Sequence, residues 1–308
     1  MAVIEKVARS AGSRPQRTSR RSRDGRIALI YLAPGVLGLL VFVVLPLVGA
    51  FVVSFYDWGL TTGVHFTGLA NYRKLFTKDV NFPVVLRNTL IFVVIYTPLN
   101  LLCALGMATW LNTRVYAKGL FRVLFFLPVI TPSVANALVW RFMLQQDGLV
   151  NQVIRVFGGH GSDWLQGPTT AMVWVIVLSI WQSFGYNLIV LGAGLDAIED
   201  NLYEAARIDG AGPLRRFFSV TLPMLSPALF FTSTMTLISA FQVFTQPQLL
   251  TGGGPGESTN TLVLYLYQNG FSFDRLGYAS AIGWVLFAMI MIVTGVQFAG
   301  QRRWVHYV

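Results

Sequence analysis

The stretch EAARIDGAGPLRRFFSVTLPMLSP, residues 204–227, is a charged segment that runs directly into one of the long apolar parts of the chain. Residues 202–209 are mainly good helix formers, and Gly210 follows them. Glycine commonly comes directly after the end of a helix. The pattern predicts a short surface helix, after which the chain re-enters the membrane at Leu222 and Pro223. Its adjacent alanines and flanking charges suit docking into a groove on a soluble partner.

The composition indicates a membrane protein. The chain has 308 residues, of which 54% are hydrophobic and 12% are charged, and its mean hydropathy is +0.59. Soluble domains average about 25% charged residues. A membrane-spanning helix needs roughly 20 apolar residues, and six uncharged runs meet this requirement. We therefore expect an all-α integral membrane protein with six transmembrane helices, within residues 27–56, 88–113, 123–140, 164–195, 217–256 and 276–301.

Two of these runs are too long for a single straight span. The run 27–56 would be about 45 Å long as a helix, which exceeds a hydrocarbon core of roughly 30 Å. Either tilt or a break near Pro34 or Pro46 is expected to absorb the excess. Within the run 217–256 we expect the helix over residues 226–244 and a loop over residues 251–256.

Lysine and arginine gather on one side of the predicted helices. Residues 1–26 hold eight of them, and the two later segments on that side and the last residues hold three, three and two. The three segments on the other side hold four, two and one. Because basic residues are enriched on the cytoplasmic side, both termini and the 204–223 loop are predicted to be cytoplasmic.

We divide the chain into a basic cytoplasmic tail, residues 1–26, and a transmembrane domain, residues 27–308. The net charge of +10 comes mostly from the tail. It has no aromatic interleaving and no periodicity, which argues against nucleic-acid binding. The tail is expected to orient the first helix and to contact anionic lipid headgroups; a specific binding site is the alternative.

Catalytic and cofactor motifs are missing from the sequence. None of the four lysines follows a glycine as in a phosphate-binding Walker A loop. The three histidines make no metal-ligand spacing, and no nucleophile elbow is present. The six predicted helices contain no Asp, Glu, Lys or Arg, which argues against an ion-coupled carrier. We therefore expect a non-catalytic transport subunit that depends on another chain for energy.

The spacing across residues 204–223 resembles the EAA motif of permease subunits in binding-protein-dependent ABC importers. That motif is EAA, three residues, Gly, nine residues, an aliphatic residue, any residue and then Leu-Pro. The chain meets every fixed position if Val220 takes the place of the usual Ile. An ordinary helical loop that matches by chance is the alternative.

Other stretches extend the resemblance, over residues 27–300, to the carbohydrate-type branch of these importers, which includes maltose and glycerol-3-phosphate permeases. The glycine-rich LTGGGPG at residues 250–256 is the part most typical of that branch. The remaining stretches are Pro46, SFYDW at 54–58, FTGLANY at 66–72, Asn88-Thr89, Phe121-Arg122, Leu127-Pro128, Trp140-Arg141, GLVN at 148–151, Arg207-Ile208-Asp209 and LGYASA at 276–281.

The resemblance implies a division of labour in a bacterial inner (cytoplasmic) membrane. This subunit would pair with a second, similar permease, and two copies of a cytoplasmic ATPase would bind the pair. A secreted solute-binding protein would deliver solute from outside. ATP and Mg would be bound by the ATPase, and this chain would hold no cofactor or metal. When the ATPases close, the EAA helices would transmit this movement and switch the permease pair from an inward-facing to an outward-facing state.

The same resemblance assigns roles in the coupling loop. Glu204 would pair with a basic residue of the ATPase, while Ala205 and Ala206 would permit close approach. Helix propensity is the alternative explanation for the two alanines. The full coupling set is Glu204, Ala205, Ala206, Asp209, Gly210, Leu222 and Pro223.

Polar and aromatic residues within the fourth and fifth predicted helices are candidates for the substrate path. Sugars are bound by hydroxyl and amide hydrogen bonds and by aromatic faces, so these residue types suit a sugar or polyol. Bonds within or between helices are the alternative role for these side chains. The candidates are Trp181, Gln182, Ser183, Tyr186, Asn187, Thr236, Ser239 and Gln242.

Other solutes stay open at this point. The predicted helices hold no cation that would meet a phosphate, which favours a neutral sugar over glycerol-3-phosphate. A permease for amino acids or peptides would fit the EAA loop but not the LTGGGPG stretch. A stand-alone channel would need no EAA loop.

Overall fold

The computed structural model describes residues 31–59, 63–113, 115–302 and 304–305. The chain forms two compact units, Met1–Val52 and Val53–Val308. We describe each unit by itself. The basic tail predicted over residues 1–26 lies outside the described residues.

The described part of the first unit is a helix, which runs through Tyr31–Val53. It contains a π-helical turn, η1 (Leu40–Val44), followed by α2 (Leu45–Val53). Pro46 has no N–H to offer the preceding turn, and the helix accommodates it through η1, where the Leu45 N–H bonds to the Leu40 carbonyl. Of the two alternatives for this run, tilt or a break near Pro34 or Pro46, the break is absent from Tyr31–Val53, because a π turn absorbs the irregularity at Pro46.

The second unit opens with a short antiparallel hairpin, which is the one β element among the described residues of an otherwise helical chain. Its strands are β1 (Tyr56–Gly59) and β2 (Gly63–Phe66), with Tyr56 opposite Phe66. The buried Asn71 of α3 (Ala70–Thr77) donates to the carbonyls of Ser54 at 2.9 Å and Tyr56 at 2.8 Å. These bonds hold the start of the hairpin against α3.

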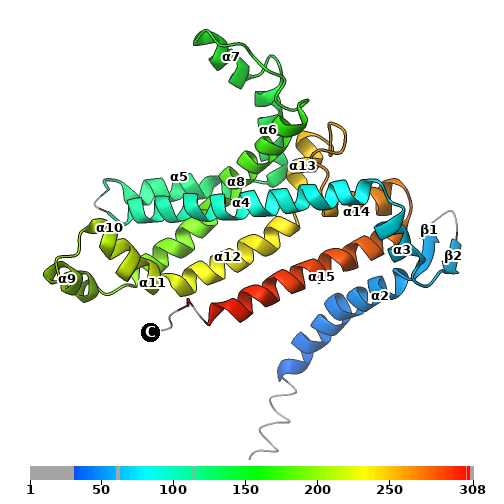
Figure 1. Cartoon of the computed structure of the whole chain (residues 1–308), viewed down its shortest axis with the longest axis horizontal. Helices are drawn as coiled ribbons and strands as arrows, with labels where there is room; N and C mark the ends of the chain where they lie inside the picture. Colours follow the sequence, from blue (N-terminus) through cyan, green and yellow to red (C-terminus); the bar gives the residue numbers. More distant parts are fainter. Residues whose placement is uncertain (1–30, 60–62, 114, 303, 306–308) are drawn as a thin grey trace, which may run out of the picture. The chain divides into compact units, whose positions relative to one another are not determined.

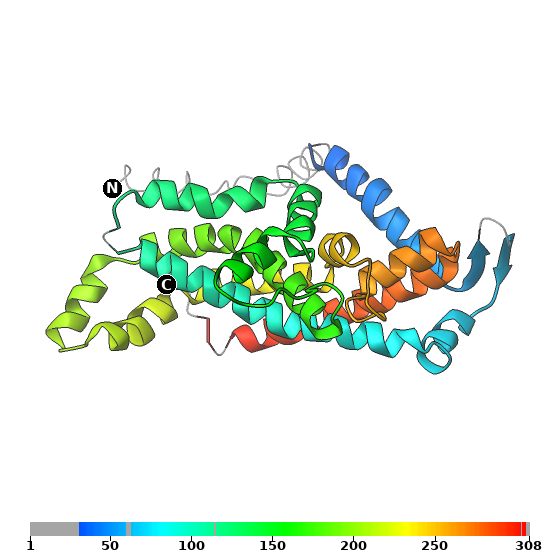
Figure 2. The same cartoon turned by 90° about the horizontal axis from the view of Figure 1, so that it is seen from above.

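Three long helices form the frame of this unit: α4 (Asn81–Leu111), α8 (Pro168–Asp196) and α15 (Leu276–Gln301). Each is long and apolar enough to cross a membrane, as is Tyr31–Val53. α8 packs along α4, and α15 has the bounds of the sixth predicted run. Figures 1 and 2 show α9 and α10 at one end of the unit and β1, β2 and α3 at the other.

The third predicted span is not one helix over residues 123–140. It is α5 (Lys118–Ile130) and α6 (Ser133–Leu144), and the pair is bent by 95°. Thr131 is extended, as a residue before proline prefers to be. Pro132 cannot donate to the Pro128 carbonyl, so the Asn136 side chain donates there instead, at 3.1 Å. The Pro128 carbonyl therefore keeps a hydrogen-bond partner at the bend.

The fifth predicted span is also bent, by 69°. Its helix α12 (Ser226–Phe241) begins where we expected but ends three residues before residue 244. The segments before it are α10 (Pro213–Arg216), η2 (Phe217–Thr221) and α11 (Leu222–Met224). The described residues hold four candidate spans, or up to six if each bent pair counts as one span.

After α12 the chain forms the short helix α13 (Thr245–Leu250), a loop, α14 (Leu262–Tyr267) and the π turn η3 (Gln268–Ser272). The predicted loop at residues 251–256 is confirmed. Asn88 on α4 donates to the carbonyls of Glu257 at 2.6 Å and Asn260 at 3.1 Å. The segment directly after the glycine-rich stretch and the Asn88-Thr89 pair, far apart in sequence, are therefore in direct contact.

Asp79 joins the start of α4 to α14 and α15. Its carboxylate accepts hydrogen bonds from the Tyr265 hydroxyl at 2.6 Å and from the Tyr278 hydroxyl. Burial would raise the pKa of this carboxyl, but the two hydroxyl bonds and two backbone N–H bonds outweigh burial and lower it. Asp79 is therefore charged at neutral pH and holds three elements together.

Candidate functional site: a polar cavity and a surface loop

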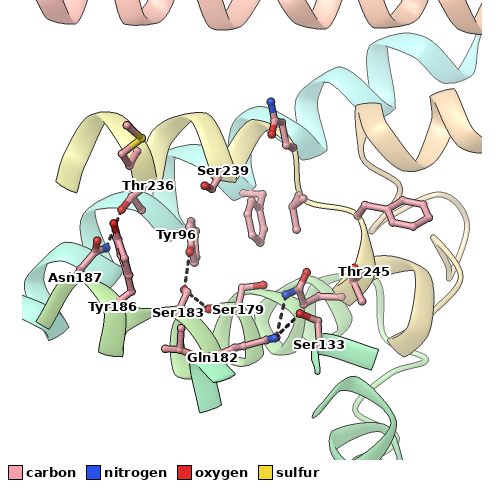
Figure 3. Close-up of a pocket in the computed structure, with 17 residues that line it drawn as sticks. Tyr96, Ser133, Ser179, Gln182, Ser183, Tyr186, Asn187, Thr236, Ser239 and Thr245 are labelled. Atoms are coloured by element: carbon pink, nitrogen blue, oxygen red, sulfur yellow. Dashed lines mark hydrogen bonds between the residues drawn. The ribbon is translucent and has the colours of Figure 1, made fainter. Parts of the chain in front are cut away.

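A cavity of about 390 Å³ opens among the helices of the second unit (Figure 3). Seven of the eight residues predicted to line a substrate path surround it. They come from α8 and from the end of α12, whereas α4, α6 and α13 supply lining residues that we did not predict. The seven are Gln182, Ser183, Tyr186, Asn187, Thr236, Ser239 and Gln242.

Asn187 is buried and joins three helices at one side of the cavity. Its amide nitrogen donates to Asn100 Oδ1 on α4 and to Thr236 Oγ1 on α12, both at 2.7 Å. Asn100 also donates to Ser183 Oγ at 2.9 Å. Because an unpaired amide is costly away from water, this network fixes α4, α8 and α12 relative to one another.

Tyr96 lines the cavity and was not among the predicted residues. Its hydroxyl lies 2.7 Å from Ser183 Oγ, as Figure 3 shows. Tyr96 and Asn100 are four positions apart, which places them on one face of a helix. This pair of polar residues within an apolar run was the signal that could have identified them.

Gln182 bridges two further elements. Its amide nitrogen donates to Ser133 Oγ on α6 at 2.6 Å, and its carbonyl oxygen accepts from Gln246 Nε2 on α13 at 3.1 Å. The side chain is only 7% exposed. Gln182 therefore lines the cavity and also joins α8 to α6 and α13.

Three other lining residues present free polar groups to the cavity. Gln242, Tyr186 and Ser239 are exposed, and their side chains make no hydrogen bond to any residue that the structure describes. An amide and two hydroxyls offer both donors and acceptors. These groups are available to a ligand without the loss of an existing bond.

Trp181 is outside the cavity lining. Its ring stacks at a tilt against Trp140 of α6, with ring centroids 5.6 Å apart. The side chain points away from the face of α8 that carries Gln182 and Asn187, since successive residues of a helix lie about 100° apart around its axis. The predicted path residue is thus a packing residue between α6 and α8 in this conformation.

The second part of the candidate site is the loop that contains α9 (Asp200–Ile208). Gly210 has a positive φ of 74°. Its N–H bonds to the Arg207 carbonyl at 3.0 Å, and the Ala211 N–H bonds to the Ala206 carbonyl at 2.9 Å. This pair of bonds is the Schellman motif, which requires a left-handed residue directly after the helix. The predicted helix, over residues 202–209, is confirmed, but it begins two residues earlier, at Asp200, and ends at Ile208.

The exposed face of α9 carries the predicted docking residues. Glu204, Ala205 and Asp209 are exposed and Ala206 is half-buried. Glu204 forms no ion pair with any described residue, so its charge is free to meet another chain. The Tyr203 hydroxyl lies 3.1 Å from Thr221 Oγ1, which ties α9 to the segment that leads back into α12.

Leu222 and Pro223 form α11, one residue before the 69° bend. The carbonyl of Pro223 would normally bond to the N–H four residues later, but that residue is proline. Ser226 Oγ donates to this carbonyl instead, at 2.6 Å. The bend is therefore a stable feature of the fold, and it sets the direction in which α12 leaves the loop.

Residues 100–306 match the family described as "Binding-protein-dependent transport system inner membrane component". This match covers more than half of the chain, and it includes α9, the bend and most of the cavity. The chain belongs to this family. It is the inner-membrane permease component of an ABC transport system, and in such systems the permease is the non-catalytic part.

The permease is similar to two characterised relatives over most of its length. It is 36% identical over 276 residues to the sulfoquinovosyl glycerol transport permease SmoG of Agrobacterium fabrum, covering 89% of each chain. It is 34% identical over 280 residues to the lactose transport permease LacF of Rhizobium radiobacter, covering 89% of this chain and 93% of LacF.

The fold of the permease also matches a solved structure. A chain of the bacterial alginate ABC transporter, crystallised in complex with an alginate pentasaccharide-bound periplasmic protein, superposes with a TM-score of 0.78. The match covers 94% of the permease and 98% of that chain, at 22% sequence identity. Shared fold at this identity shows the architecture of a multi-pass membrane permease.

Proposed function

We propose that this permease imports a neutral sugar or a related polyol, and that the cavity around Gln242 binds the solute during passage. The observation that carries the proposal is the lining: amides, hydroxyls and aromatic rings, with no charged side chain among its residues. Hydroxyl groups of a sugar exchange hydrogen bonds with such groups, and aromatic faces pack on its apolar faces. The name of LacF, a lactose transport permease, supports a neutral glycoside as solute.

Anionic solutes fit the cavity less well. A phosphate or a carboxylate needs a cation or a cluster of N–H donors to offset its loss of hydration. The cavity lining offers no cation, and three of its four side-chain amides already donate to other side chains. A glycerol-3-phosphate, amino-acid or peptide permease is therefore the second candidate, and the uncharged lining favours the sugar.

We propose further that energy reaches the cavity through α9. A cytoplasmic ATPase, present in two copies and holding the ATP and Mg, docks on Glu204, Ala205 and Ala206. Movement of α9 is transmitted through the Tyr203–Thr221 contact to α11 and α12, because these segments are continuous with it. Thr236, Ser239 and Gln242, on or next to α12, then shift relative to α8.

The remaining partners are a second, similar permease and an extracytoplasmic solute-binding protein. The family description, which names binding-protein-dependent transport, supports the second of these. The spacing of the EAA motif supports the first, since the resemblance implies one such loop in each of two permeases. The proposal places both termini and α9 in the cytoplasm.

This orientation predicts a labelling pattern. With Cys103 replaced by serine, a Ser162→Cys variant in intact cells is expected to react with an impermeant thiol reagent, and a Gly212→Cys variant is not. Ser162 and Gly212 are both exposed, and a Cβ at Gly212 meets no atom within 4 Å. Both variants are expected to react after the membrane is permeabilised. Labelling of Gly212→Cys alone in intact cells would reverse the orientation and remove the ATPase from α9.

Comparison of Gln242 with Gln182 tests the role of the cavity. We expect Gln242→Ala in the reconstituted importer to raise the KM for sugar-stimulated ATPase activity roughly two- to tenfold, the value of one lost hydrogen bond of about 0.5–1.5 kcal/mol. The melting temperature should not change, because Gln242 bonds to no described side chain.

Gln182→Ala is the matched variant, because it removes the same amide group from a position where that amide is hydrogen-bonded. It breaks the contacts with Ser133 and Gln246, so we expect a lower melting temperature. Each such bond contributes about 0.6 kcal/mol to the free energy of unfolding of a membrane protein. A Gln242→Ala variant with a lowered melting temperature and unchanged KM would assign Gln242 to packing and contradict the proposed path.

A further inference from the structure

A second polar cavity, of about 310 Å³, lies at the other end of the α6–α13 pair. α6 and α13 pack against each other. Their first residues, Ser133 and Thr245, line the first cavity. Their last residues, Leu144 and Leu250, line the second. The two cavities are thus separated by the length of these two short helices.

The wall of the second cavity is held rigid by a buried amide. Asn151 on α7 (Leu149–Val156) is 0% exposed. It donates to the carbonyls of Gln145 and Gln146 at 3.1 Å and of Ser162 at 2.9 Å. Its oxygen accepts from the Ser162 N–H at 3.0 Å and the Trp164 indole at 2.8 Å. These bonds bring the segments on both sides of α7 together, so the cavity wall is formed before any ligand arrives.

The side chains on this wall are unpaired. Gln145, Gln146 and Gln166 all line the cavity, and their amide groups make no hydrogen bond within the described chain. Each amide offers two donors and an acceptor with two lone pairs. Three free amides on a rigid wall can therefore exchange several bonds with neighbouring hydroxyl groups of one solute.

The charges and the size of this cavity suit the same class of solute. Arg141 and Asp163 line it with opposite charges, and neither joins an ion pair among the residues that the structure describes. The Arg141 guanidinium contacts only the Leu249 carbonyl, at 3.4 Å. Opposite charges give no net attraction for an anion. Three leucines with Thr251, Gly254 and Pro255 complete the lining, and the volume is within the range of small-molecule sites.

From these observations we infer that the second cavity is an entry site for the hydroxyl-rich solute, occupied before the cavity around Gln242. The inference rests on the proposed import of a sugar or polyol. In the proposed orientation, the segments that form the second cavity are on the outer side of the membrane. A solute that leaves it for the first cavity passes the bridge that Gln182 makes with Ser133 and Gln246.

Protection of single cysteines by sugar tests the inference. The full importer is reconstituted without its solute-binding protein, in a Cys103→Ser background, with Gln145→Cys or Gln166→Cys introduced. Lactose, maltotriose and raffinose are first tested for uptake by the complete system, and the imported sugar is used as the probe. We expect this sugar to slow alkylation by N-ethylmaleimide at least fivefold at both positions. Omission of the binding protein removes the alternative that a docked protein covers the cavity.

Two control positions make the result decisive. Gln152→Cys, on an exposed glutamine of α7 outside the cavity, should be alkylated at the same rate with and without sugar. Gln242→Cys, in the first cavity, should be protected. Protection at Gln242→Cys without protection at Gln145→Cys and Gln166→Cys would overturn the entry site and leave the proposed function intact. Equal protection at Gln152→Cys would also overturn it, as a general conformational effect.

The proposed function is tested by a separate measurement, which is uptake by the complete system. If the complete system imports none of the three sugars but imports an amino acid, a peptide or glycerol-3-phosphate, the solute class is wrong and the entry site for sugars falls with it. If a sugar is imported and protects neither Gln242→Cys nor the second cavity, both sites are contradicted while import of sugar stands.

Discussion

We expect the Gly210→Pro variant to reach the membrane in normal amounts and to take up no solute. Gly210 has a φ of 74° and donates its N–H to the Arg207 carbonyl. Proline fixes φ near −65° and has no N–H, so it removes both the left-handed turn and one bond of the Schellman motif. The exposed coupling face of α9 would then point in a different direction, although no buried contact of the transmembrane helices is changed.

Gly210→Asn is the control for this variant, because asparagine tolerates the left-handed conformation better than other residues. Uptake by Gly210→Asn should be largely retained. Uptake is measured as radiolabelled solute in cells, and abundance by immunoblot of the membrane fraction. Normal uptake by Gly210→Pro at normal abundance would contradict the coupling role of α9.

Reversal of the Glu204 charge should have a comparable effect. Glu204 is exposed and has no partner within the described chain, so Glu204→Lys should leave the stability of the permease unchanged and repel the basic residue proposed on the ATPase. Glu199→Lys makes the same charge change at an exposed position just before α9. Equal loss of uptake in both variants would indicate a general charge effect on the loop and not a specific contact.

The second large effect is expected from Gly185→Ala, which should prevent correct folding. Gly185 is on the face of α8 that meets α5, and a Cβ there would lie 2.0 Å from the Phe125 carbonyl oxygen. The backbone of α5 cannot move as a flexible side chain can. We therefore expect a cost at or above the upper end of the roughly 1–3 kcal/mol typical of overpacked sites.

The effect is measured as the amount of monodisperse protein after detergent extraction and as its melting temperature. Gly106→Ala, on α4, is the matched control, since a Cβ there meets no atom within 4 Å. Gly106→Ala should behave as the unaltered protein. Equal yields and melting temperatures for the two variants would show that α5 and α8 are not in close contact at Gly185.

The features that could be predicted from the sequence depend on local chemistry. The long uncharged runs predicted the spanning helices, because hydrocarbon admits few charges over roughly 20 residues. The bounds of α15 agree with its run. The end of α9 was also predictable, since Gly210 supplies a conformation that other residues adopt at a cost. The polar residues of α8 and α12 predicted seven of the residues that line the cavity, because polar side chains within membrane helices usually face the interior of the bundle or a cavity.

The tertiary structure decided how those local features combine. A Thr-Pro pair such as Thr131-Pro132 can break a helix wherever it occurs. Here a 95° bend brings Ser133 to Gln182, and two residues 49 positions apart meet only through packing. Asn187 likewise finds Asn100 at a separation of 87 residues. The cavity is lined by Tyr96, Ser133 and Gln246, which were not predicted, and it excludes Trp181, which was, because each helix turns one face inward. Hydropathy determined which segments enter the membrane, whereas the close backbone approach at Gly185 and the pairing of buried amides determined which faces meet.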